Sequence, residues 1–191
     1  MFQVVALIDM DAIRSPPIET LAIACKRYGP GRMPGAGRRD IGAGYAGSAA
    51  ALAIAIGFAL SMAVLPTLGL SSDFAHPFWG LAALVSLPIV VPVAFVASVF
   101  VWRALPSDVP YFGVVAGFLA TVVTYLASLA IVFLIRLLWF WWTGAESVLV
   151  DVGGFVALIG LFATVLTVWL TIPVGCVSGA IYEYARRISS A

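Results

Sequence analysis

The stretch from residue 109 to residue 142 reads VPYFGVVAGFLATVVTYLASLAIVFLIRLLWFWW. Its first part, residues 109–135, contains no charged side chain, and Arg136 is followed at once by leucines, tryptophans and a phenylalanine. A helix rises about 1.5 Å per residue, so roughly 20 apolar residues cross the hydrocarbon layer of a membrane. A helix that is apolar on every face is typical of a membrane span. The stretch therefore predicts a membrane-spanning helix.

Three further stretches of similar length lack acidic residues, lysine and arginine: residues 41–72, 74–102 and 152–182. The chain of 191 residues is 63% hydrophobic and 10% charged, whereas soluble domains average about 25% charged residues. We therefore predict an all-α integral membrane protein. Its four transmembrane helices are expected at about residues 44–70, 78–105, 110–142 and 148–187. They would form one domain, residues 41–187, between an amino-terminal extension, residues 1–40, and a tail, residues 188–191.

The distribution of basic residues predicts the orientation of these helices. All lysines and arginines except Arg136 lie before the first predicted span, beside the connection between the second and third spans, or at the end of the fourth. The opposite connections contain Asp73, Glu146 and Asp151. Because basic residues are enriched on the cytoplasmic side, we expect both termini in the cytoplasm and the chain in the plasma membrane.

The amino-terminal extension allows several interpretations. Within residues 15–27, apolar side chains recur at helical spacing between Ser15-Pro16-Pro17 and the basic pair Lys26-Arg27. This pattern fits a short amphipathic helix on the membrane surface and fits a disordered basic tail equally well. A third interpretation starts the natural chain at Met33.

Two segments recur in the second half of the chain and indicate an internal duplication. Residues 45–47 (YAG) resemble residues 111–113 (YFG), and residues 92–98 (PVAFVAS) resemble residues 173–179 (PVGCVSG). The chain would then consist of two tandem helical hairpins, related by an axis along the membrane normal. Chance similarity between apolar helices is the competing explanation.

Three prolines lie within predicted spans, namely Pro88, Pro92 and Pro173. Prolines at matching positions of two halves can mark broken helices around a transport site near the middle of the membrane. Proline is also tolerated in spanning helices as a simple kink. We favour kinks over a transport site.

Small and hydroxylated residues form stripes at helical spacing in the third and fourth predicted spans. These candidate packing positions are Gly113, Gly117, Thr121, Thr124, Ser128, Thr164, Thr167, Thr171, Gly175 and Gly179. Small residues let helix backbones approach closely, and hydroxyls can bond across the interface. A polar path for a solute would need the same residues, but hydroxyls alone neither bind ions strongly nor relay protons. We therefore favour packing.

Arg136 is the one basic residue that interrupts an apolar run. An arginine in the middle of a membrane is costly and would indicate function. By helical rise, however, Arg136 falls near the outer interface, beside Trp139, Trp141 and Trp142. An interfacial arginine can extend its charge to water among such an aromatic belt. We favour this anchoring role over a binding role.

The sequence contains no motif for catalysis, for a cofactor or for a metal. His76 has only Asp73 as a nearby carboxylate, and Cys25 and Cys176 form no pattern. Ionisable clusters that hydrolases, proton pumps and ATPases require are missing from the spans. We therefore predict a protein that is not an enzyme, binds no nucleic acid and contacts the lipid bilayer and either itself or another membrane protein. Its expected role is that of an accessory or scaffold subunit, or a homo-oligomer, acting through helix packing. A small transporter or channel subunit is the alternative.

Overall fold

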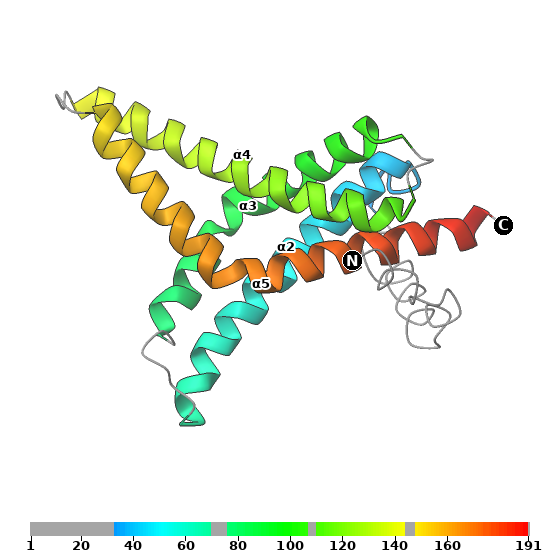
Figure 1. Ribbon diagram of the computed structural model, residues 1–191, viewed down its shortest axis with the longest axis horizontal. Coiled ribbons are helices and arrows are strands. Elements are labelled where there is room, and N and C mark those ends of the chain that lie inside the picture. The colour runs from blue at the N-terminus through cyan, green and yellow to red at the C-terminus, as the bar shows by residue number, and fades with distance from the viewer. Residues whose placement is uncertain (1–32, 70–75, 107–109, 144–147, 191) are drawn as a thin grey trace, which may run out of the picture.

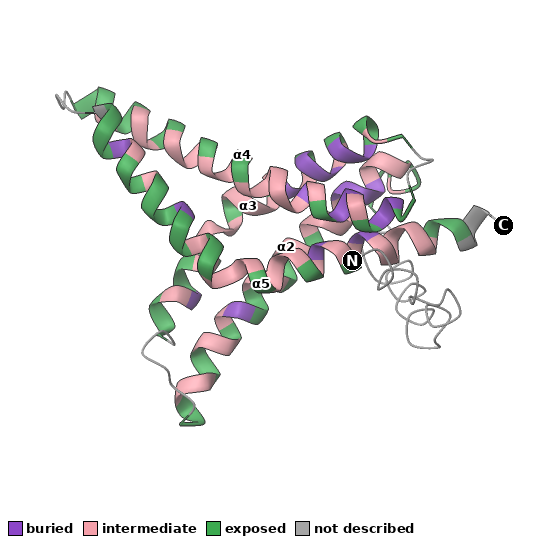
Figure 2. Cartoon of the chain, in the orientation of Figure 1, coloured by how far each residue is buried: buried purple, intermediate pink, exposed green. Residues whose placement is uncertain are grey.

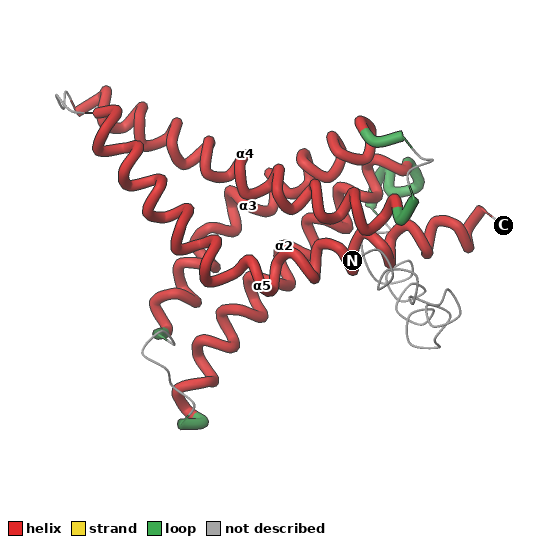
Figure 3. The backbone as a smooth tube through the Cα atoms, in the orientation of Figure 1, coloured by secondary structure: helices red, strands yellow, loops and turns green. Residues whose placement is uncertain are grey.

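The computed structural model describes residues 33–69, 76–106, 110–143 and 148–190, and within these ranges the chain is helical and contains no strand (Figure 3). The described residues form α2 (Arg39–Thr67), α3 (Pro77–Ala104), α4 (Phe112–Thr143) and α5 (Val148–Ser190). All four helices are long and apolar enough to cross a membrane. The prediction of an all-helical chain with four such helices is confirmed. The amphipathic segment at residues 15–27 and the connection at residues 144–147 lie outside the described residues.

The helix ends differ from the predicted ends where local chemistry overrides hydrophobicity. Helix α2 begins at Arg39 rather than at residue 44, and Asp40 occupies its first turn, where a negative charge favours the helix dipole. It ends at Thr67, because Gly69 adopts a left-handed φ of 69°, a common way for a helix to stop. Helix α5 continues to Ser190, through most of the predicted tail.

Two turns set where α3 and α4 begin. The His76 side chain caps α3 by accepting a hydrogen bond from the Phe78 backbone amide at 3.1 Å, and Pro77 takes the first helical position, which needs no amide hydrogen. Helix α4 starts at Phe112 rather than at residue 110, because Tyr111 has a φ of 54°. A left-handed residue cannot continue into a right-handed helix, so the two residues before Phe112 belong to the turn.

The four helices pack as two pairs. Helix α2 runs along α3 and α4 runs along α5, while α3 also contacts α4 and α2 contacts α5. Figure 1 shows the two pairs lying against each other near the C-terminus and diverging toward the opposite end. We call the joined end the basic end, because Arg38, Arg39, Arg103, Arg186 and Arg187 lie there, and the opposite end the distal end.

The basic end holds most of the buried residues, as Figure 2 shows. The buried cluster consists of Ala43, Val101, Trp102, Phe112, Ala116 and Ala120. Trp102 of α3 lies at its centre, with its ring 4.8 Å from that of Phe112 on α4 and 5.0 Å from that of Tyr182 on α5. The Tyr182 hydroxyl donates to the Arg39 carbonyl of α2 at 3.0 Å. Each of the four helices therefore contributes a residue to this junction.

Ion pairs surround the junction at the basic end. Arg103 of α3 holds Asp40 of α2, with 2.6 Å between Nε and Oδ2. On α5, Glu183 pairs with Arg187 one turn later at 3.0 Å. The arginines of both pairs are largely exposed, so solvent screens these pairs and they contribute little beside the aromatic contacts.

Helices α4 and α5 approach each other backbone to backbone at four glycines. A β-carbon at Gly113 would lie 2.6 Å from the Gly179 carbonyl oxygen, and one at Gly117 would overlap the Gly175 carbonyl oxygen. Glycine is therefore the residue that this crossing requires. The absence of side chains brings the two backbones into van der Waals contact.

We expect Gly117→Ala to destabilise the protein, because the new methyl group must push α4 and α5 apart. Overpacking of this kind costs about 1–3 kcal/mol. The measurement is unfolding of the purified protein in mixed micelles with increasing denaturing detergent. Gly154→Ala on α5 is the matched control, since nothing lies within 4 Å of a β-carbon there. Equal stability of the two variants would contradict the glycine contact.

Candidate functional site

A cavity of about 780 Å³ lies between the α2/α3 pair and the α4/α5 pair. This volume falls in the range of small-molecule sites, about 300–1,000 Å³. All four helices line the cavity, and among the described residues no acidic or basic side chain does so. Its surface is mainly apolar. The cavity is the candidate functional site because it is a hollow between helices that the chain's own side chains leave unfilled.

The wall formed by α2 owes its shape to small side chains. The α2 residues that line the cavity are mostly alanines and a glycine: Ala43, Ala46, Gly47, Ala50, Ala51, Ile54, Ala55 and Phe58. These residues recur at intervals of three and four, so they share one face of the helix. Because alanine side chains are short, the space between the helix pairs is left open along this face.

The two ends of the cavity are aromatic. Trp102 and Tyr182 line it at the basic end, where they belong to the junction of the four helices. Toward the distal end, Trp79 of α3 stacks on Phe162 of α5, with 5.6 Å between the ring centres and 21° between the planes. This stacked pair bridges the two helix pairs beyond the junction. Aromatic pairs contribute about 0.5–1.5 kcal/mol beyond the area they bury.

Hydroxyl groups line the cavity on α4 and α5, but most of them are already bonded. Thr121 donates to the Gly117 carbonyl at 2.9 Å, and Thr124 donates to the Ala120 carbonyl at 2.7 Å, one turn back in each case. Such bonds satisfy a threonine within its own helix. Because their hydrogen atoms are already used, these hydroxyls can do little to replace the hydration of a polar solute.

Tyr125 and Ser128 differ from these threonines, because neither hydroxyl bonds a carbonyl of its own helix. The Tyr125 hydroxyl reaches across from α4 to α5, where it bonds Thr171 at 3.0 Å and also contacts the Thr167 hydroxyl. The Ser128 hydroxyl is buried without a hydrogen-bond partner in the described part of the chain. Tyr125 therefore joins α4 to α5, while Ser128 contributes a buried, unpaired hydroxyl to the cavity wall.

The structure divides the predicted packing face into three parts. Gly113, Gly117, Gly175 and Gly179 meet one another at the α4/α5 crossing. Thr121, Thr124, Ser128, Thr167 and Thr171 line the cavity, as do three of these glycines. Thr164 is exposed and donates to the Gly160 carbonyl at 2.7 Å. The glycine stripes are thus in contact with each other within a single chain.

The structure does not bring the three prolines to the cavity. Pro88 and Pro92 lie within the continuous helix α3, and Pro173 lies within α5. All three are exposed on the outer surface of the helix pairs and none lines the cavity.

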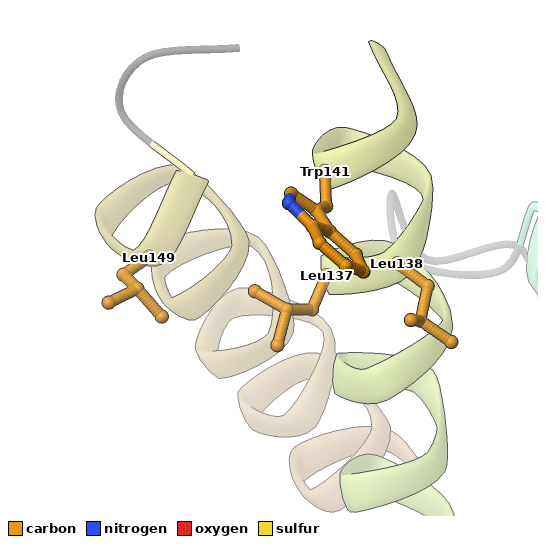
Figure 4. A pocket seen from close by; sticks show the side chains of 4 residues that line it. All are labelled: Leu137, Leu138, Trp141 and Leu149. Atoms are coloured by element: carbon orange, nitrogen blue, oxygen red, sulfur yellow. The ribbon is translucent and has the colours of Figure 1, made fainter. Parts of the chain in front are cut away.

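The tryptophans beyond Arg136 lie at the distal tip of the α4/α5 pair. Trp139, Trp141 and Trp142 are all exposed. Trp141 helps to line a small apolar hollow with Leu137, Leu138 and Leu149, in which Leu137 points toward α5 (Figure 4). An exposed tryptophan cluster at a helix end suits the interfacial region of a membrane.

Arg136 itself turns toward α5. Its guanidinium carbon lies 4.4 Å from the ring centre of Phe155 on α5 and 5.4 Å from that of Phe140 on its own helix. Its Nε atom is buried and has no hydrogen-bond partner among the described residues. Phe155 lines the cavity, and so does Val132, one turn before Arg136 on α4. Arg136 therefore lies at the distal rim of the cavity.

Sequence reasoning missed the aromatic residues that shape this site: Trp79, Trp102, Phe112, Tyr125, Phe162 and Tyr182. Each is one of several aromatic residues in an apolar run, and the contacts of Trp79 and Trp102 join different helix pairs. Helical periodicity relates residues within one helix and carries no information on such pairs. The cavity itself had one signal in the sequence, the alanine-rich face of α2.

Compared with known proteins, the chain matches no protein-family model, no curated protein and no solved structure. Within the described ranges, no three histidine, cysteine, aspartate or glutamate residues form a group that could hold a metal ion.

Proposed function

We propose that this chain is a non-enzymatic, multi-pass membrane protein that binds an apolar molecule of the bilayer in the cavity between its two helix pairs. The observation that carries this proposal is the cavity of about 780 Å³, apolar along its length and without a charged lining residue among those described. A polar substrate would lose its hydration there without gaining a charged partner, which is costly. An apolar molecule gains van der Waals contacts at no such cost.

Binding in the cavity is compatible with the role of an accessory or scaffold subunit. The glycine stripes that motivated this role pack against each other inside the chain, so association with another subunit would use other faces. Large exposed apolar side chains such as Leu60, Val85 and Phe100 cover those faces. They would contact lipid or a partner helix equally well, so the cavity is the more specific feature.

A small transporter or channel subunit is the second candidate. The feature that favours it is the position of the cavity between two helix pairs, since transport sites often lie between repeats. The exposed prolines do not support a path for ions or polar solutes. A transporter of this architecture would carry an apolar molecule through the same cavity.

The predicted duplication has support from matching contacts in the two pairs. In the sequence correspondence, Gly47 matches Gly113 and Ser98 matches Gly179. In the α2/α3 pair a β-carbon at Gly47 would overlap the Ser98 hydroxyl, and in the α4/α5 pair one at Gly113 would press on the Gly179 carbonyl. Matching residues therefore face each other in both pairs, and the cavity lies at the interface of the two proposed repeats.

We expect Ala50→Phe to empty the site, because the phenylalanine ring would occupy the cavity from α2. The measurement is native mass spectrometry of protein extracted with its surrounding lipid, which reports the apolar molecules that stay bound. Ala49→Phe is the matched control, because Ala49 is the exposed neighbour of Ala50 and does not line the cavity. Equal retention by both variants would contradict the proposed site. The transporter would be favoured if the protein moves an apolar probe between the two leaflets and if Ala50→Phe, but not Ala49→Phe, blocks this transfer.

We further propose that the protein lies in the plasma membrane and that its basic end faces the cytoplasm. Five arginines and two carboxylates, Asp40 and Glu183, lie at that end among the described residues, while Arg136 and Asp151 are the charged residues described near the distal end. This asymmetry follows the positive-inside rule. A reporter fused to the C-terminus should therefore be active when it requires the cytoplasm. Activity of a reporter that requires export would reverse the orientation.

A further inference from the structure

We propose that the occupant of the cavity is an anionic membrane lipid, whose acyl chain lies in the cavity and whose negatively charged headgroup binds Arg136 at the distal rim. This inference rests on the proposed function, because it names the class of apolar molecule that the site takes. The two features that carry it are the apolar cavity and the guanidinium group beside it.

The position of Arg136 connects the charge to the cavity. On α4, Ser128 and Val132 line the cavity, and Arg136 follows on the same face at the next helical turn. Across the seam its guanidinium lies over Phe155, 4.4 Å from the ring centre, and Phe155 belongs to the cavity wall. A chain that leaves the cavity along Val132 and Phe155 would thus reach Arg136 directly.

The guanidinium group has unused hydrogen-bonding capacity on this side. Nε of Arg136 is buried and lacks a hydrogen-bond partner in the described part of the chain. Guanidinium presents donors in a planar fork that matches the oxygen atoms of a phosphate or carboxylate. The Ser128 hydroxyl could donate to a carbonyl one turn back, as the neighbouring threonines do. The planar Arg136 guanidinium suits an anion better than a neutral carbonyl.

Asp151 of α5 is the described acidic residue closest to this rim along the helix, one turn before Phe155. Asp151 is exposed, whereas the Arg136 guanidinium lies over Phe155 of the cavity wall. A lipid anion would therefore approach Arg136 from the cavity side, and Asp151 would remain on the solvent side.

The stacked rings favour a flexible chain over a helix as the occupant. Trp79 and Phe162 join the two helix pairs across the distal part of the cavity. A helix of a second copy, about 10–12 Å in diameter with its side chains, would have to separate these rings. An acyl chain can pass beside them and continue along the small side chains of α2. A lipid also supplies both required parts, the apolar chain and the charged head.

The test compares two lipids with identical acyl chains, phosphatidylglycerol and phosphatidylcholine, offered at equal amounts to the purified full chain in mixed micelles. Native mass spectrometry then reports how much of each lipid is bound. We expect phosphatidylglycerol to be preferred by the parent protein. In Arg136→Gln this preference should fall by roughly tenfold, because one charge-assisted contact is lost. Arg136→Lys keeps the charge and should retain part of the preference, which also controls for folding.

Two further variants separate the possible results. Arg187→Gln removes an exposed arginine at the basic end and should leave the preference unchanged. Ala50→Phe should reduce the binding of both lipids. An unchanged preference in Arg136→Gln, with both lipids still excluded by Ala50→Phe, would overturn the headgroup site and leave the apolar site standing. Absence of both lipids from the parent protein, or a second copy of the chain in their place, would overturn both proposals.

Discussion

The contact of Trp102 with Phe112 and Tyr182 joins the two helix pairs, and the rest of the architecture depends on it. Trp102 comes from one pair, Phe112 and Tyr182 come from the other, and the Tyr182 hydroxyl extends the contact to the Arg39 carbonyl on α2. The Arg39 guanidinium, 4.2 Å from the Phe112 ring centre, covers the cluster with a cation–π contact. Within a membrane, packing and polar contacts of this kind replace the hydrophobic effect as the force between helices.

The aromatic junction holds the two helix pairs together only at the basic end. Beyond it, the size of the side chains decides how much space remains between the pairs. At the crossing of α4 and α5, glycine meets glycine and the backbones touch, so the two helices leave no space between them at this point. Between the pairs, alanines of α2 face α4 and α5 across a distance that their methyl groups do not span, and the cavity results. The Trp79–Phe162 stack limits how far the pairs diverge. The same principle, small residues on a helix face, therefore produces a tight seam in one place and a cavity in another.

Much of the fold could be predicted from the sequence, because the length and polarity of each apolar run are local properties. The runs located four helices, and errors arose at Gly69 and Tyr111, where a left-handed backbone ends or delays a helix. The site was less predictable. The glycines and threonines stood out by their spacing, but spacing does not tell which helix they face. Trp79 and Phe162 meet only because of the tertiary arrangement, and no sequence pattern indicated that Arg136, predicted as an interfacial anchor, lies against Phe155 of the cavity wall.

The divergence of the two helix pairs from a single junction can be measured by electron–electron distance spectroscopy in lipid bilayers. Spin labels would replace exposed residues of α3 and α4, in a chain whose Cys25 and Cys176 are changed to serine. One pair of labels, at Ala104 and Val114, reports on the basic end, and the other, at Leu81 and Leu138, reports on the distal end. We predict a distal distance longer than the basic one by at least about one helix diameter, ~10 Å. Equal distances at both ends would describe a parallel bundle and contradict both the junction and the cavity.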